Sequence, residues 1–243
     1  MTNKTKFTFH GRTALRITNV FAAAALLLTM AFSAHAQLLS IPSKFTIDFT
    51  GLICDSTTKE LSSDEPYVFL VVGNLVTGQL VVSRTGVFGD VDTGESRAQT
   101  VRIWGPTGVA SAFPNGNPEN LVILVAPMEH DDCDVQSLHA KLQSSLQSRF
   151  LTLRAQLGGI TRASLVTQLA TTMAIQQQCS VGCLFCDRDQ PIGRPVELHI
   201  TSRDVSNTGT VVMTLNHDGR DIGNGFYRTV FRVQGSTLTL QRR

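Results

Sequence analysis

The sequence predicts a mainly β fold: an antiparallel β-sandwich of eight or nine strands with an inserted α-helical hairpin. Short segments that are wholly apolar, or that alternate between apolar and polar residues, recur along the chain. Turns rich in Gly, Pro, Asn and Asp separate them, as in other sandwiches. One stretch of about 40 residues changes to helical spacing. We therefore expect a single sandwich domain over 37–243, interrupted by helices at about 134–178.

Five predicted strands precede the helical stretch. Phe45, Ile47 and Phe49 alternate with polar residues, which is the pattern of a half-buried strand. Residues 67–72 (YVFLVV) are wholly apolar and rich in β-branched and aromatic types, which is typical of a central strand. The other three segments are 79–84 (QLVVSR), 99–104 (QTVRIW) and 121–127 (LVILVAP).

Two helices are predicted next. The first begins after Asp134, a suitable N-cap, and stops at the pair Gly158-Gly159. We expect the apolar stripe of the hairpin either to cover part of the sandwich or to form an amphipathic element that contacts a membrane. The stripe consists of Val135, Leu138, Leu142, Leu146, Phe150, Leu153 and Leu157 in the first helix, and of Leu165, Leu169 and Met173 in the second.

Strand patterns return after the hairpin. Val196, Leu198 and Ile200 alternate with polar residues in 195–202 (PVELHITS). A turn rich in Gly and Asp then separates two further strands. The remaining segments are 210–216 (TVVMTLN), 226–233 (FYRTVFRV) and 237–241 (TLTLQ).

Residues 1–36 have the pattern of a secretory signal peptide. Four basic residues precede the apolar run 20–32, and Ala34 and Ala36 place small residues before a cleavage point at Gln37. Removal of the segment would leave 17 basic and 19 acidic residues, a net charge of −2. We therefore expect an exported protein, periplasmic or extracellular, without the basic surface of a nucleic-acid-binding protein.

The five cysteines all follow the predicted signal peptide. Three of them form a C-x3-C-x2-C run, the spacing with which radical S-adenosylmethionine enzymes hold an iron–sulfur cluster. Export to an oxidising compartment and the 57 residues after the run argue against such an enzyme, and no second ligand pair has zinc-like spacing. Two disulfides and one free thiol are expected, with the pairing open, among Cys54, Cys133, Cys179, Cys183 and Cys186.

Three predicted loops concentrate carboxylates. They are 55–65, 90–95 and the pair of segments 129–134 and 187–189 that flank the hairpin. Calcium takes six to eight oxygen ligands and favours flexible carboxylate loops. Asp is also common in turns, because its side chain bonds the local backbone. The loops therefore indicate either a cation site or ordinary turns.

Residues 55–72 (DSTTKELSSDEPYVFLVV) resemble the first calcium loop of the calcium-and-lipid-binding β-sandwich of synaptotagmins and protein kinase C. In that family an Asp precedes a Ser-Asp-Pro-Tyr-Val run. Residues 129–134 (EHDDCD) and 187–193 (DRDQPIG) resemble the family's third loop. The sequence departs from the pattern through the inserted Glu65 and through about 50 residues that interrupt the third loop and include the helical hairpin.

This resemblance implies a calcium site and disulfides near one end of the sandwich. Cys133 and Cys179 bracket the hairpin, so a bridge between them would clamp its base, and Cys54 would reach Cys183 or Cys186. The calcium ligands implied are Asp55 and Asp64 in the first loop and Glu129, Asp131 and Asp189 in the third.

Three functions are compatible with the sequence. The first is an exported, calcium-dependent binding module for a surface, lipid, glycan or protein ligand, with membrane contact possible. The second is a metal-independent structural or interaction protein of the cell envelope. The third is a secreted hydrolase, although the sequence has no nucleophile elbow, zinc-protease helix or phosphate loop. Catalysis is therefore the least favoured of the three.

Overall fold

The computed structural model describes residues 40–58, 64–105, 117–131, 134–177, 189–206, 209–220 and 225–239, with side chains omitted at 40–44, 206 and 236–239. The chain divides into two units, Ile41–Leu238 and the two chain ends, and the sandwich belongs to the first. The predicted signal peptide and four of the five cysteines lie outside the described residues.

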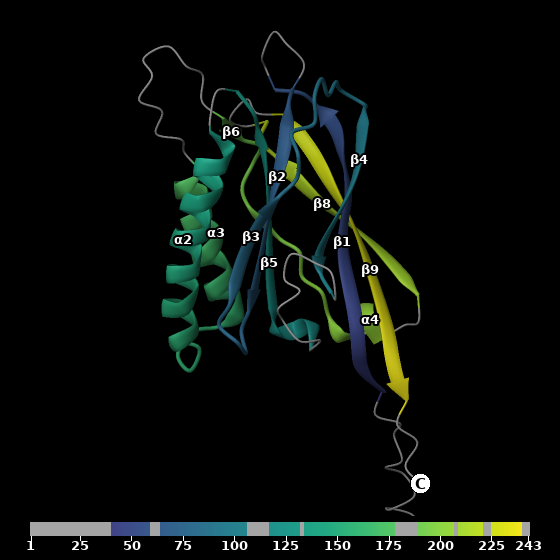
Figure 1. Ribbon diagram of the computed structural model, residues 1–243, viewed down its shortest axis with the longest axis vertical. Helices are drawn as coiled ribbons and strands as arrows, with labels where there is room; N and C mark the ends of the chain where they lie inside the picture. The colour runs from purple at the N-terminus through teal and green to yellow at the C-terminus, as the bar shows by residue number, and fades with distance from the viewer. Residues whose placement is uncertain are drawn as a thin grey trace, which may run out of the picture. The chain divides into compact units, whose positions relative to one another are not determined.

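Nine strands form two antiparallel sheets in the described part of the chain, which confirms the predicted sandwich (Figure 1). The first sheet has the order β4 (Ser96–Trp104), β1 (Ser40–Ser56), β9 (Phe226–Thr239) and β8 (Thr210–Asp218). The second sheet has the order β3 (Leu80–Arg84), β2 (Pro66–Asn74) and β5 (Leu121–Glu129). Two short strands, β6 (Gln190–Pro191) and β7 (Val196–Glu197), both pair with the other side of β5.

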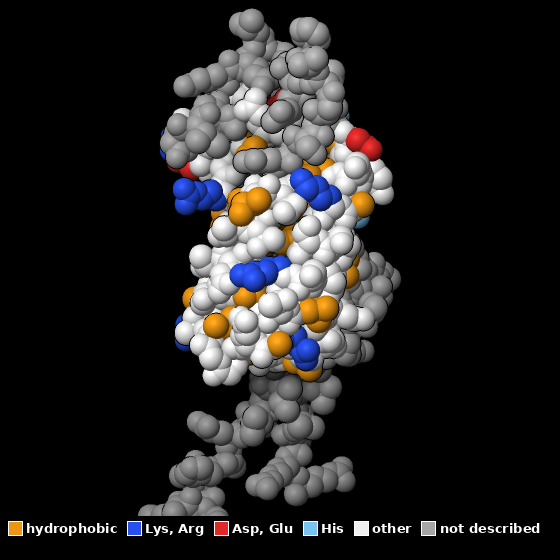
Figure 2. All heavy atoms as spheres, turned by 90° about the vertical axis from the view of Figure 1, so that its left-hand side faces the viewer, with side chains coloured by type: hydrophobic (Ala, Val, Ile, Leu, Met, Phe, Trp, Pro, Cys, Tyr) orange, Lys and Arg blue, Asp and Glu red, His pale blue; other side chains and the backbone are white. Residues whose placement is uncertain are grey.

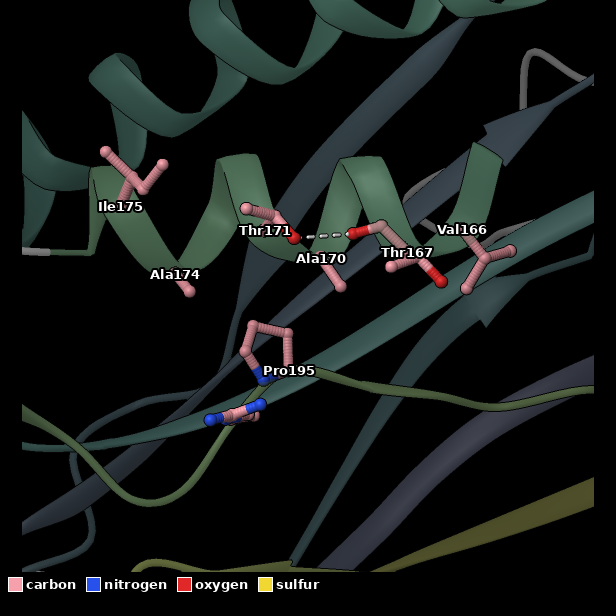
Figure 3. A pocket seen from close by; sticks show the side chains of 8 residues that line it. Val166, Thr167, Ala170, Thr171, Ala174, Ile175 and Pro195 are labelled. Atoms are coloured by element: carbon pink, nitrogen blue, oxygen red, sulfur yellow. Dashed lines mark hydrogen bonds between the residues drawn. The ribbon is translucent and has the colours of Figure 1, made fainter. Parts of the chain in front are cut away.

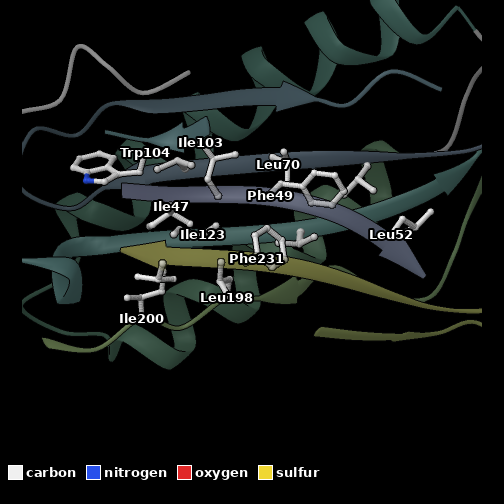
Figure 4. Close-up of a cluster of buried hydrophobic side chains, with 14 of the residues drawn as sticks. Ile47, Phe49, Leu52, Leu70, Ile103, Trp104, Ile123, Leu198, Ile200 and Phe231 are labelled. Atoms are coloured by element: carbon white, nitrogen blue, oxygen red, sulfur yellow. The ribbon is translucent and has the colours of Figure 1, made fainter. Parts of the chain in front are cut away.

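The main core lies between the two sheets. Alternating apolar residues of β1 point into it and meet side chains of β2 and β9 (Figure 4). The Phe49 and Phe231 rings pack edge to face with centroids 5.7 Å apart, and Phe45 stacks on Trp104 at 5.8 Å. This burial is the physical result of the period-two pattern in the sequence, because alternate side chains of a strand point to one face.

The helical hairpin forms a third layer on the outer face of the second sheet, so it covers a face of the sandwich (Figure 1). It consists of α2 (Val135–Ala155) and α3 (Arg162–Gln176). In β2, Val68 and Leu70 belong to the core between the sheets, whereas Tyr67 and Phe69 belong to the cluster under the helices. The strand is buried on both faces, which explains why its sequence has no polar alternation.

The helix boundaries follow local capping. Asp134 accepts hydrogen bonds from the N–H groups of Gln136 and Ser137, as predicted, and Thr161 caps α3. The first helix ends at Ala155, three residues before the predicted stop at Gly158. Within the described residues, neither helix combines the length and apolar character needed to cross a membrane.

A row of side chains on α2 covers the free edge of β3. Gln143 accepts from Val82 N at 2.7 Å and donates to Leu80 O at 2.9 Å. Gln147 accepts from Leu80 N at 2.8 Å and donates to Gly78 O at 3.1 Å. A helix can reach an edge strand in this way because residues four apart lie on one face. The edge is thereby closed to another strand.

The strand predicted at 195–202 is confirmed only in part, since Val196 and Glu197 pair with β5 and Leu198 N still donates to Ile123 O. The chain then leaves the sheet and turns into the short helix α4 (Ser202–Ser206). The other short helix, η1 (Pro118–Asn120), lies directly before β5. The Asp204 carboxylate accepts from Thr201 N and Oγ1, which favours the turn over the strand. The predicted strand 237–241 is partly the continuation of β9, which runs to Thr239.

Candidate functional site

Asp64 and Asp189, two of the predicted calcium ligands, lie on opposite faces of the second sheet. Asp64 is buried and accepts from Thr58 N at 2.9 Å, from Thr58 Oγ1 at 2.6 Å and from the hydroxyl of Tyr227. Tyr227 belongs to the core between the sheets, so Asp64 faces the first sheet. Burial, and then the neighbouring carboxylate, raise the pKa of Tyr227, so the hydroxyl stays protonated as a donor.

Asp189 is buried near the helical layer. It accepts from the Tyr67 hydroxyl at 2.8 Å and from Asp131 N at 2.8 Å, and His130 Nδ1 lies 3.3 Å away. Tyr67 belongs to the cluster under the helices. Burial, followed by the charge of Asp189, raises the pKa of the Tyr67 hydroxyl. The imidazole of His130 therefore faces the carboxylate of Asp189.

The other two predicted ligands have separate surroundings. Glu129 is buried at the end of β5, where it accepts from Glu65 N at 3.3 Å. Asp55 lies on the outer face of the first sheet and accepts two hydrogen bonds of 2.7 Å from the Arg228 guanidinium. This pairing raises the pKa of Arg228 and uses both carboxylate oxygens of Asp55.

The structure thus brings Asp131 and Asp189 together and separates them from Asp55 and Asp64. In the part of the chain that the structure describes, no three His, Cys, Asp or Glu side chains are grouped so that they could hold a metal ion. The two tyrosines that bind the buried carboxylates were not predicted from the sequence. A signal was available, because a buried Tyr normally needs a partner for its hydroxyl.

Cys54 is a free thiol buried in the main core. The predicted bridge from Cys54 to Cys183 or Cys186 is therefore not formed. Burial is the largest cause that raises the pKa of this thiol, and nearby carboxylates add to it. Cys133, Cys179, Cys183 and Cys186 lie outside the described residues, so the pairing expected between Cys133 and Cys179 stays a prediction.

An open groove of about 510 Å³ lies between α3 and the segment 194–195 (Figure 3). This groove, called the α3 groove, has small and apolar residues along the helix and a proline opposite them. Ile175 stands at the groove with 60% of its surface exposed, unlike most apolar side chains here. The lining residues are Val166, Thr167, Ala170, Thr171, Ala174, Ile175, Arg194 and Pro195.

The polar groups of the α3 groove are few. Thr167 Oγ1 donates to Ala163 O at 2.9 Å, and Thr171 Oγ1 donates to Thr167 O at 2.8 Å. Both hydroxyl protons are therefore used within the helix. Arg194 is exposed and is the only charged residue among the described residues that line the groove. The groove was not predicted from the sequence, because its two walls are almost 20 residues apart along the chain and meet only in the fold.

Comparison with known proteins gave little. No family model matches the sequence, and no curated protein matches it. Among solved structures, a C2 domain of plant extended synaptotagmin 1 is similar at 10% identity, over 82% of this chain and 99% of that domain, with a TM-score of 0.37. This likeness is too low to carry an argument about fold or function.

Proposed function

We propose that this chain is an exported binding module that holds an acyl chain with an anionic head group in the α3 groove. The observation that carries the proposal is an apolar groove whose one charged side chain is a guanidinium, that of Arg194. Sites for small ligands are usually apolar, with a small number of polar groups that fix orientation. The groove volume of about 510 Å³ lies within the range of such sites.

The shortage of polar groups selects the ligand class. A peptide brings an N–H and a C=O with each residue, and a glycan brings several hydroxyls, all of which need partners when buried. The helix side of the groove has already used the hydroxyl protons of Thr167 and Thr171, so it offers neither ligand a donor there. An acyl chain needs no partners. Among lipid, glycan and protein ligands, the groove therefore favours a lipid.

The charge of the hairpin favours an anionic head group. Residues 135–176 contain four basic residues and no Asp or Glu. Figure 2 faces this layer and shows Lys and Arg among uncharged and apolar side chains. Arg194 would bind a carboxylate or phosphate through charge-assisted hydrogen bonds, for which a guanidinium is well suited. We propose this role for Arg194 and none for the basic residues of the hairpin. Arg149 bonds the side chain of Gln168, Arg154 and Arg162 bond backbone carbonyls, and Lys141 lies on the other helix.

Binding of hexadecanoate, measured by titration calorimetry below its micelle concentration, tests the proposal. We expect Arg194→Glu to weaken binding by about tenfold or more and Arg194→Lys to weaken it less, since a charged hydrogen bond contributes about 1.5–3 kcal/mol. Ala174→Phe fills the groove and should abolish binding. Lys141→Glu makes the same charge change on an exposed part of the other helix and should leave binding unchanged. No binding by the folded protein, or equal binding by Arg194→Glu, would refute the proposal.

Calcium dependence, expected from the sequence, is tested by thermal unfolding. Asp55 and Asp64 already accept hydrogen bonds from Arg228 and Tyr227. We therefore expect the Tm of the protein to be the same in EDTA and in millimolar calcium. A rise in Tm that calcium causes and magnesium does not, and that is lost in Asp131→Asn, would instead support the calcium-dependent module.

Export is proposed from the pattern of residues 1–36. A mature protein whose measured mass corresponds to a chain that begins at Gln37 would support it.

A further inference from the structure

The outer edge of β8 differs from the other three sheet edges. The edge of β3 is covered by Gln143 and Gln147 of α2. The opposite edge of the second sheet consists of strands of two residues each, one of which contains Pro191. The edge strand β4 contains two arginines. Helical cover, shortness, proline and charge are the usual protections of sheet edges against further strands.

β8 has none of these protections from Thr210 to Asn216. Its sequence there is TVVMTLN, with no charge, proline or glycine. It pairs with β9 over nine residues without a register shift, so no bulge distorts it. No described strand pairs with its other side. The free backbone groups of such an edge are a template for another strand.

The C-terminal end of β8 is covered, because the segment that runs from Gly193 into β7 lies against it. A Cβ on Gly193 would lie 2.9 Å from Asp218 O, so the two backbones are in close contact. The Arg194 backbone also contacts the buried imidazole of His217. We define the open edge as Thr210–Asn216, the part of β8 that precedes His217 and Asp218.

The open edge also leaves apolar surface uncovered. Val211, Met213 and Leu215 pack against the main core, yet they are only partly buried. The core-facing residues Phe231 and Val233 of the neighbouring strand β9 are fully buried. On the outer face, Val212 is 66% exposed. A strand laid along the open edge would cover this apolar area and satisfy the free backbone groups.

We propose that the occupant is a second copy of this chain, with the two β8 strands antiparallel about a two-fold axis at Met213. This register pairs all seven residues of the open edge. Val211 then faces Leu215 of the second copy, and Val212 faces Thr214. No charged residues face each other, so the surface is complementary to itself, as a two-fold interface requires. The two four-stranded sheets become one continuous sheet of eight strands.

Paired charge variants of the full exported chain test this register by analytical ultracentrifugation over a wide concentration range. We expect the wild type to be a reversible dimer. Val212→Lys with Thr214→Lys places two pairs of like charges directly opposite each other and should weaken the dimer about tenfold. Val212→Lys with Thr214→Glu places opposite charges there and should retain the dimer. Both positions lie on the outer face, outside the core.

The outcomes distinguish the proposal from its alternatives. A wild type that is monomeric at every concentration overturns it. A dimer that the two variants affect equally shows that another surface is used, and also overturns it. Circular dichroism and Tm of both variants confirm that the fold is intact. Since hexadecanoate binding depends on the α3 groove and not on β8, the two proposals can fail independently.

Discussion

Truncation of Gln143 on α2 tests how the hairpin is attached to the sandwich. Its amide makes two hydrogen bonds to the edge of β3, at 2.7 Å to Val82 N and 2.9 Å to Leu80 O. Gln143→Ala removes both and leaves a donor and an acceptor without partners. At about 1 kcal/mol for each hydrogen bond, the free energy of unfolding should fall by about 2 kcal/mol. For a domain of this size, that lowers Tm by about 4–8 °C.

Residue-specific amide hydrogen exchange gives a sharper assay than Tm. The Val82 amide should exchange faster in Gln143→Ala, because its acceptor is lost. The amide of Val81, whose register partner is Val72 in β2, should keep its protection. Gln136→Ala, an exposed change on the same helix, is the matched control and should alter neither Tm nor exchange.

Unchanged exchange at Val82 in Gln143→Ala would refute this reasoning, since it would mean that the side chain does not protect the edge. A fall in Tm with uniformly faster exchange in all strands would also contradict it. In that case the substitution would act on global stability and not on the edge of β3. A similar result is expected for Gln147→Ala at the Leu80 amide, whose acceptor is Gln147.

Three further predictions concern buried polar groups. Burial lowers the pKa of His217 from 6.5 to about 4, with the Arg194 backbone opposing the shift. The free energy of unfolding should therefore fall by about 3 kcal/mol as pH falls from 6.5 to 4. Chemical denaturation of His217→Gln over the same pH range should not show this fall. Tyr227→Phe removes a donor to the buried Asp64 and should lower the free energy of unfolding by about 1–3 kcal/mol, measured by urea titration; an unchanged midpoint would contradict the contact. Cys54, whose pKa is raised by burial, should react with iodoacetamide only after unfolding, which mass spectrometry of labelled peptides would show; rapid labelling of the native protein would disprove its burial.

The strands and helices were largely predictable, because their patterns are local. The alternation of Phe45, Ile47 and Phe49 and the N-cap at Asp134 depend on neighbouring residues, and the structure confirms both. The strand predicted at 195–202 is confirmed only at Val196–Glu197, for a local reason that competed with the pattern. Asp204 bonds the backbone and hydroxyl of Thr201 and turns the chain into a helix.

The partners of buried charged groups, in the candidate sites and elsewhere, were much less predictable. Asp48 alternates onto the outer face of the first sheet, yet it is buried beneath Arg102 and Arg232. Burial opposes its ionisation, but hydrogen bonds from both arginines outweigh this and hold its pKa below the ordinary value. These partners lie 54 and 184 residues away along the chain, so no sequence window contains them.

The sequence by itself determined the period of each element and therefore which side chains share a face. Only the tertiary structure decided what each face meets. Asp64 and Asp189 both lie near the same end of β2, but one bonds Tyr227 of the first sheet and the other bonds Tyr67 beneath the helices. The α3 groove and the open edge of β8 arise in the same way. Their position depends on which elements become neighbours, and that is fixed by long-range packing and strand pairing.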